Sequence, residues 1–174
     1  MAKNTFQGPV KSLSGFMASG PGSVVNLTAS TTLTVDDHAG RLLRVNNAAC
    51  TITLPLINAT AADAADGPGY APAGLNNLGT TFRFLIQTAS TALIITTSGT
   101  TDKLYGSATV GVDNSATDKA FFPAATNAVI TLNGTTKGGL VGSYIEITAV
   151  SALAWMVKAT LNGSSAPATP FSDA

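Results

Sequence analysis

The side chains that could perform acid–base, nucleophilic or metal chemistry are few and scattered in this chain. His38 is the only histidine and Cys50 the only cysteine. A protein zinc site usually draws several ligands from Cys and His, and one of each is too few. Hydrolysis by a Ser-His-Asp arrangement would need His38 as its base, and no serine lies in a Gly-x-Ser-x-Gly turn. The sequence therefore predicts neither a metal centre nor a serine nucleophile.

The run Asp36-Asp37-His38 is the densest group of titratable residues. Adjacent residues of an extended strand point to opposite faces, so the three side chains would not converge on one ligand. Ala39 and Gly40 follow at once, and we expect a polar turn between strands at 31–35 and 41–46. Cys50 lies in an alternating apolar stretch, which predicts a small, buried and unreactive thiol.

The carboxylates and glycines do not complete a site either. Glu146 is the only glutamate, whereas glycoside hydrolysis needs two facing carboxylates. It lies between Ile145 and Ile147 on an alternating strand, so we expect it to face solvent. The glycines at 138–142 lack the Lys-Ser/Thr that completes a phosphate-binding loop, and Asp113-Asn114 is only the nearest approach to calcium-loop spacing. We predict a protein that is not an enzyme and holds no cofactor or metal.

Composition narrows the range of partners. Only 10% of the 174 residues are charged, and nine basic side chains balance nine acidic ones; an average domain has about 25% charged residues. A nucleic-acid binder needs a basic surface, and a membrane-surface protein gains from one, so we expect neither partner. Soluble monomers usually keep a net charge. The surface is either buried against copies or a partner, or coated with Thr, Ser and Asn.

The sequence pattern predicts that short β-strands position these residues. Thr, Val, Ile, Leu and Phe occur in brief runs bounded by Gly, Asn, Asp and Ser, several of them with strict alternation, which indicates strands with one buried face. We predict an all-β fold, an antiparallel β-sandwich or jelly-roll-like domain with an extended N-terminal arm. Ten strands are expected, at 24–28, 31–35, 41–46, 50–54, 80–87, 92–97, 108–112, 128–132, 143–150 and 154–161.

Three segments fall outside this pattern. Residues 1–22 have no strand or helix periodicity but keep the apolar side chains Phe6, Phe16 and Met17, so they are expected to form an arm that orders on another surface or folds over its own core. The β-domain is expected at 23–165, with a long loop at 55–79 that is functional or interface-forming, and a C-terminal tail at 166–174. A shorter loop carries Phe121 and Phe122, which need burial in their own core or against a neighbouring subunit.

Virion proteins of tailed bacteriophages show a similar succession of segments. The likeness begins with LTVDDHAGRLLRV at 33–45 and TITLP at 51–55, and continues with GTTFRFLI at 79–86 and LIITT at 93–97. It ends with GSYIEI at 142–147 and WMV at 155–157. In order, these segments resemble the small β-domains of phage head-decoration and tail-fibre proteins, over roughly residues 30–160.

The resemblance implies a capsid decoration (cement) protein, a non-enzymatic structural protein that binds the outside of the assembled capsid and stabilises it. It implies the major capsid protein and a homotrimer of itself as partners, and a location on the virion exterior after synthesis in the host cytoplasm. Phe6, Phe16 and Met17 are the candidate capsid-docking residues, and Phe121 and Phe122 the candidate oligomer or partner contacts. The alternative is a receptor- or carbohydrate-binding head of a tail fibre or lectin-like module, using Tyr70, Tyr105 or Trp155.

Overall fold

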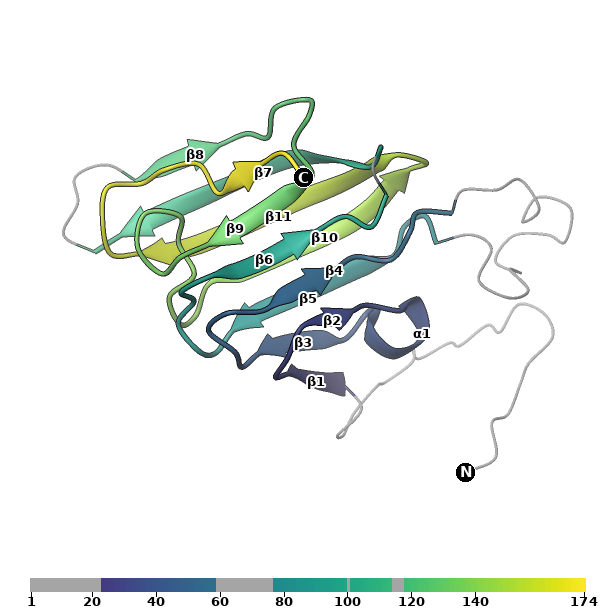
Figure 1. Ribbon diagram of the computed structural model, residues 1–174, viewed down its shortest axis with the longest axis horizontal. Helices are drawn as coiled ribbons and strands as arrows, with labels where there is room; N and C mark the ends of the chain where they lie inside the picture. The colour runs from purple at the N-terminus through teal and green to yellow at the C-terminus, as the bar shows by residue number, and fades with distance from the viewer. Residues whose placement is uncertain (1–22, 59–76, 100, 114–117) are drawn as a thin grey trace, which may run out of the picture.

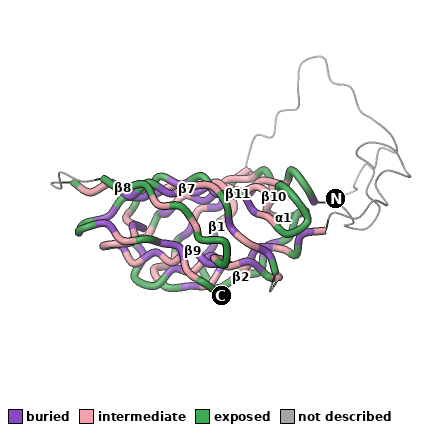
Figure 2. The backbone as a smooth tube through the Cα atoms, turned by 90° about the horizontal axis from the view of Figure 1, so that it is seen from above, coloured by how far each residue is buried: buried purple, intermediate pink, exposed green. Residues whose placement is uncertain are grey.

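Strands form where the sequence alternates between apolar and polar residues, because each sheet has one face on the core and one in solvent. The computed structural model describes residues 23–58, 77–99, 101–113 and 118–174, and in these residues two β-sheets pack face to face (Figure 1). Figure 2 shows the two layers from above, with β7, β10 and β11 in one and β2 and β9 in the other. The predicted all-β sandwich is confirmed.

The larger sheet has seven strands and the smaller one has five. The seven-stranded sheet has the order β1 (Val24–Leu27), β3 (Leu42–Val45), β5 (Thr81–Ile86), β10 (Tyr144–Ser151), β11 (Ala154–Gly163), β7 (Lys103–Val112) and β8 (Lys119–Phe121). The five-stranded sheet has the order β12 (Phe171–Ser172), β9 (Val129–Leu132), β6 (Leu93–Thr96), β4 (Thr51–Thr53) and β2 (Thr31–Thr32).

Both sheets are mixed, which corrects the predicted antiparallel arrangement. Five of the ten strand pairs are parallel: β1 with β3, β3 with β5, β7 with β11, β2 with β4, and β4 with β6. Alternation along a strand reveals which face is buried but not the direction of the neighbouring strand, so the sequence pattern could not distinguish the two arrangements.

Four of these five parallel pairs arise because strands β1 to β6 alternate between the layers as a coil; the pair of β7 with β11 lies outside it. Within β1 to β6, odd-numbered strands enter the seven-stranded sheet and even-numbered strands enter the five-stranded sheet. Hydrogen bonds also join successive turns just beyond the strand ends. The Asn46 amide donates to the Leu27 carbonyl at 2.8 Å, and the Gln87 amide donates to the Val45 carbonyl at 2.9 Å. Strands β1 to β6 thus form three successive turns of this coil at one edge of the sandwich, with β1 and β2 outermost.

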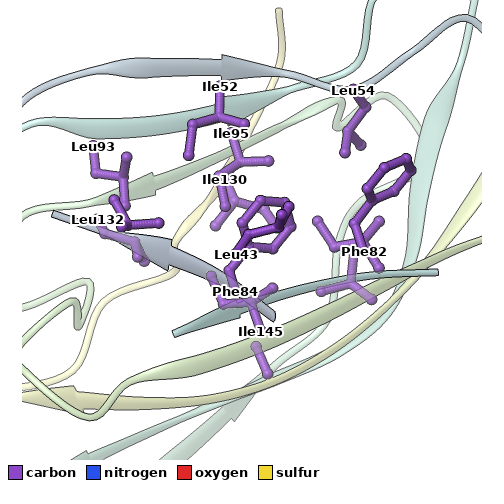
Figure 3. Packing of buried hydrophobic residues seen from close by; sticks show 14 of the residues in the cluster. Leu43, Ile52, Leu54, Phe82, Phe84, Leu93, Ile95, Ile130, Leu132 and Ile145 are labelled. Carbon is purple, nitrogen blue, oxygen red and sulfur yellow. The ribbon is translucent and has the colours of Figure 1, made fainter. Parts of the chain in front are cut away.

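The core lies between the sheets and is built from inward rows that cross them. In the seven-stranded sheet one row runs through neighbouring strands from edge to edge, as Val25, Leu43, Phe84, Ile145, Ala159, Ala108 and Phe121. Ile52, Ile95 and Ile130 face this row from the other sheet (Figure 3). Trp155 is fully buried, with its ring 6.0 Å from that of Phe82. A side chain removed from these rows would leave a cavity shared by both sheets.

All ten predicted strands overlap observed ones, and three segments were missed. These are β8, β12 and the first half of β7. Gly106 interrupts the apolar pattern of β7, and it adopts a positive φ of 102° with no room for a side chain because the Val157 carbonyl oxygen lies against it. Phe171 of β12 is buried in the core, so the β-domain continues into the segment that was predicted as a tail after residue 165.

Candidate functional site

The Asp36–His38 run forms the last three residues of a single helical turn, α1 (Val35–His38), in the connection between β2 and β3. Thr34 caps this turn: its hydroxyl accepts a hydrogen bond from the Asp37 amide at 3.3 Å, and its own amide donates to His38 Nδ1 at 3.0 Å. The connection is polar, as predicted, but helical rather than a simple turn. The Thr34 hydroxyl also lies 3.2 Å from His38 Nδ1 and donates to Asp37 Oδ2 at 3.0 Å, so the hydroxyl, the carboxylate and the imidazole all take part in the local capping of this turn.

Cys50 is buried at the end of the turn before β4, as the sequence predicts. Burial raises the pKa of its thiol above the ordinary value, which keeps sulfur in its unreactive protonated form. Within the described residues no three His, Cys, Asp or Glu side chains gather where they could hold a metal ion. The two outer sheet faces carry the remaining polar and exposed apolar side chains of the described strands.

The outer face of the seven-stranded sheet carries a row of charged side chains. Arg83 of β5, Glu146 of β10 and Lys158 of β11 are direct cross-strand neighbours. Strand alternation places them opposite the buried Phe84, Ile145 and Ala159. Glu146, predicted to face solvent, lies on this outer face but is partly covered by its neighbours. A carboxylate between two cations is the arrangement that cross-strand pairing favours.

Further contacts fix the charged row in place. Arg83 Nη2 donates to the Gly40 carbonyl at 2.5 Å, and the Tyr144 hydroxyl donates to Glu146 Oε2 at 3.4 Å. Partial burial, and then the nearby Glu146 carboxylate, raise the pKa of Tyr144 above 10.0. At the edge strand, Arg44 Nε donates to Asn26 Oδ1 at 2.6 Å. Arg44, Arg83 and Lys158 against Glu146 leave this charged region with an excess of positive charge.

Exposed apolar side chains collect at one end of the same sheet. They occur before β5, at the β10–β11 turn and on the outer face of β11 and β7; we call Leu78, Tyr105, Val150, Leu153 and Met156 the end patch. Each is at least 40% exposed. Backbone bonds bring the segments together: the Gly79 amide donates to the Ala149 carbonyl at 2.8 Å, and the Lys103 amide to the Leu153 carbonyl at 2.9 Å. Met156 is the direct cross-strand neighbour of Tyr105.

The outer face of the five-stranded sheet has a different composition. One outward row holds Thr32, Thr53 and Thr96, and a second holds Thr51, Ile94 and Thr131. No strand of this sheet contains an Asp, Glu, Lys or Arg residue. Hydroxyl and alkyl groups alone make up these two rows. The two rows can therefore form hydrogen bonds with a partner but carry no charge to orient it.

The structure separates the two predicted phenylalanine contacts. Phe121 ends β8 opposite Ala108 and packs against the core, which is the simpler of the two expectations for it. Phe122 is 73% exposed and remains available to a partner. Trp155, considered as a recognition residue, is fully buried, whereas Tyr105 is 49% exposed. The candidate docking residues Phe6, Phe16 and Met17, and also Tyr70, lie outside the described residues.

Sequence reasoning missed the end patch as a surface. Its members come from four segments, so no local run marks them. Leu153 in the short connection Ser151–Ala154 was the one available signal, because an apolar residue at the tip of a hairpin has no strand face on which to be buried.

Comparisons with known proteins supply no relative. The chain matches no protein-family profile, no curated protein and no solved structure. None of the helices in the described residues is long and apolar enough to span a bilayer.

Proposed function

We propose that this chain is a non-enzymatic virion structural protein of a tailed bacteriophage, which binds the outside of the assembled capsid and stabilises it as a decoration (cement) protein. The end patch is the observation that carries this proposal. It places the exposed Tyr105 and Met156 side by side on neighbouring strands, and aromatic and Met side chains are enriched in protein–protein contacts that have a polar rim. The charged row of Arg83, Glu146 and Lys158 supplies part of that rim.

The partner in this proposal is the major capsid protein, and the docking surface is the outer face of the seven-stranded sheet. Arg44, Arg83 and Lys158 against Glu146 favour a shell surface that is acidic on balance, because complementary charge selects the orientation of docking. Residues 1–22, with Phe6, Phe16 and Met17, add a second contact. A homotrimer would multiply these modest contacts by avidity.

The low charge of the whole chain, with 10% charged residues, fits a protein whose surface is covered in an assembly. Direct binding to a shell is therefore the property to measure.

Co-sedimentation with purified shells of the same virus that lack this protein tests the proposal. We expect saturable binding of the purified chain, weakened at least tenfold when Leu153→Ser and Met156→Ser are combined. The matched control is the pair Thr53→Ser and Thr96→Ser on the other sheet, which should bind as the unchanged chain does. A chain that stays in the supernatant at all concentrations would contradict the proposal.

The second candidate function is a receptor- or carbohydrate-binding head of a tail fibre, and exposed Tyr105 is the observation that favours it. Aromatic faces stack on apolar ring faces, and the neighbouring Met156 and Lys158 would complete a shallow site. A glycan array separates the two functions. Saturable glycan binding that is lost in Tyr105→Ala, together with no binding to shells, would replace the decoration role by receptor binding.

A further inference from the structure

The charged row on the outer face of the seven-stranded sheet ends in a cation that faces a small polar residue. Along this row Arg83, Glu146 and Lys158 alternate in sign. The neighbour of Lys158 on its other side is Ser107 of β7 rather than an acid, and Lys158 is exposed. A carboxylate placed over Ser107 would continue the alternation of charge, because opposite charges on neighbouring strands attract.

Phe122 lies on the far side of Ser107. β8 pairs antiparallel with β7, with Phe121 opposite Ala108. The same register, continued by one residue, places Phe122 beside Ser107. Because Phe121 packs against the core, alternation turns Phe122 to the outer side of the sheet, where it is 73% exposed.

Hydrogen bonds fix the turn that follows Phe122. The Ala124 amide donates to Asn127 Oδ1 at 2.8 Å, and the Asn127 amide donates to the Ala124 carbonyl at 3.0 Å. Asn127 Nδ2 donates to Asp173 Oδ1 at 2.9 Å, and the Leu104 amide donates to the Asn127 carbonyl at 2.9 Å. These bonds hold the turn against both the C-terminal segment and β7. An aromatic side chain on a backbone that is already held loses less freedom when it binds a partner.

Three larger side chains therefore surround Ser107 on the outer face; we call Tyr105, Ser107, Phe122 and Lys158 the Ser107 site. Tyr105 precedes Ser107 by two residues on the same face of β7, about 7 Å along the strand, and Lys158 is about 5 Å away on β11. The ammonium group and the hydroxyl can both donate to one carboxylate. The two aromatic rings can contact apolar atoms beside that carboxylate.

We propose that the Ser107 site receives an acidic side chain of the major capsid protein, with the carboxylate against Lys158 and Ser107 and its apolar neighbours against Phe122 and Tyr105. The inference rests on the proposed function. It extends the docking surface from the end patch, to which Tyr105 belongs, toward the β8 edge. Phe122 is then a contact with the shell rather than a contact between copies of this chain.

Carbodiimide cross-linking tests the contact, using the full-length chain bound to purified shells that lack this protein. The reagent joins an amine to a carboxylate that touches it and leaves no spacer. We expect peptide mass spectrometry to find an amide between Lys158 and an Asp or Glu of the major capsid protein. Lys137, in the turn after β9, is the matched lysine and should form none. A Lys158 link to Glu146 of the same chain alone, or to a second copy of this chain, would overturn the assignment.

Co-sedimentation with the same shells tests the apolar half of the site. We expect Phe122→Ser to weaken binding at least tenfold, as the loss of an anchoring aromatic does. The matched control is Val141→Ser, since Val141 is 61% exposed and contacts Asn162 near the opposite end of β11. This control should change binding less than twofold. Both variants should melt at the temperature of the unchanged chain.

A charge series at position 158 tests the polar half. Lys158→Glu should weaken shell binding at least tenfold, whereas Lys158→Arg, which keeps the cation, should weaken it less than threefold. If the unchanged chain binds shells but Phe122→Ser or Lys158→Glu binds equally well, the Ser107 site is wrong and the proposed function stands. If the unchanged chain does not bind, both are wrong.

Discussion

The two outer faces of the sandwich cover one core but differ in what they can recognise. The seven-stranded face combines the row of Arg83, Glu146 and Lys158 with the end patch, whereas the outward rows of the five-stranded sheet carry hydroxyls and methyl groups without charge. Both sets of strands alternate, so secondary structure alone does not distinguish them. The difference between the faces therefore comes from which side chains each register turns outward.

If the two sheets share one core, a substitution of a core residue that lies between them must weaken both sheets together. Phe84→Ala should lower the free energy of unfolding by about 3–5 kcal/mol, the usual cost of emptying a buried phenylalanine site. Its neighbour Leu85 points outward and is only partly buried, so Leu85→Ala should cost less than about 1.5 kcal/mol. Urea unfolding followed by Trp155 fluorescence and by far-UV circular dichroism should give one coincident transition. Two separate transitions would contradict a shared core.

The next largest effect concerns the strand that carries Tyr105. Gly106→Ala should destabilise the protein by about 2 kcal/mol or more, because the methyl group meets the Val157 carbonyl oxygen and the backbone has a positive φ. Gly111 of the same strand is the control, since its nearest neighbour, the Asp118 carboxylate, is at an ordinary distance of 3.8 Å. Thermal unfolding of both variants measures the difference, and equal melting temperatures would show that the close approach at Gly106 does not constrain β7.

The contrast between the faces predicts a smaller, selective effect on shell binding. Arg83→Ala and Lys158→Ala together should weaken binding several-fold and reduce its dependence on salt, because rim charges mainly steer association. Thr51→Ala with Thr131→Ala on the other face should leave both quantities unchanged. Binding measured by co-sedimentation at two salt concentrations tests this. A larger loss in the threonine variant would reverse the assignment of the docking face.

The smallest expected effect is a pH dependence confined to the charged face. The folded-state pKa of Tyr144 is raised by partial burial and by Glu146, so its contribution to stability is present below its unfolded pKa of about 10 and is lost as pH rises through the folded value. Melting temperatures between pH 9 and 11.5 should therefore fall less steeply for Tyr144→Phe than for the unchanged chain. Parallel curves for the two chains would show that Tyr144 does not titrate with folding.

Much of the fold follows from local pattern, because alternation predicts where strands run and which residues are buried. Ile52, Phe84 and Ile145 are buried as their alternation indicates. The direction of pairing was not accessible, since parallel and antiparallel neighbours impose the same alternation. Strand β12 was missed because its two residues follow Pro170 and are held by contacts distant in sequence, the pairing with β9 and the burial of Phe171 in the core.

The candidate site was harder to predict than the fold. The buried Cys50 and the local use of His38 follow from their sequence neighbours. The end patch does not, because the Leu78, Tyr105 and Leu153 segments meet only when β5, β10, β11 and β7 align. The phenylalanine pair illustrates the same limit: adjacent residues Phe121 and Phe122 end up packed on the core and 73% exposed, respectively, because β8 stops between them.

The number of copies of this protein per major capsid protein in purified virions of its source tests the central proposal most directly. Quantitative mass spectrometry or calibrated gel densitometry of those particles gives the ratio. A decoration protein predicts a ratio near one copy per shell subunit, with the protein removable from intact particles. A handful of copies per particle would contradict decoration in favour of a tail location, and complete absence would contradict a virion role.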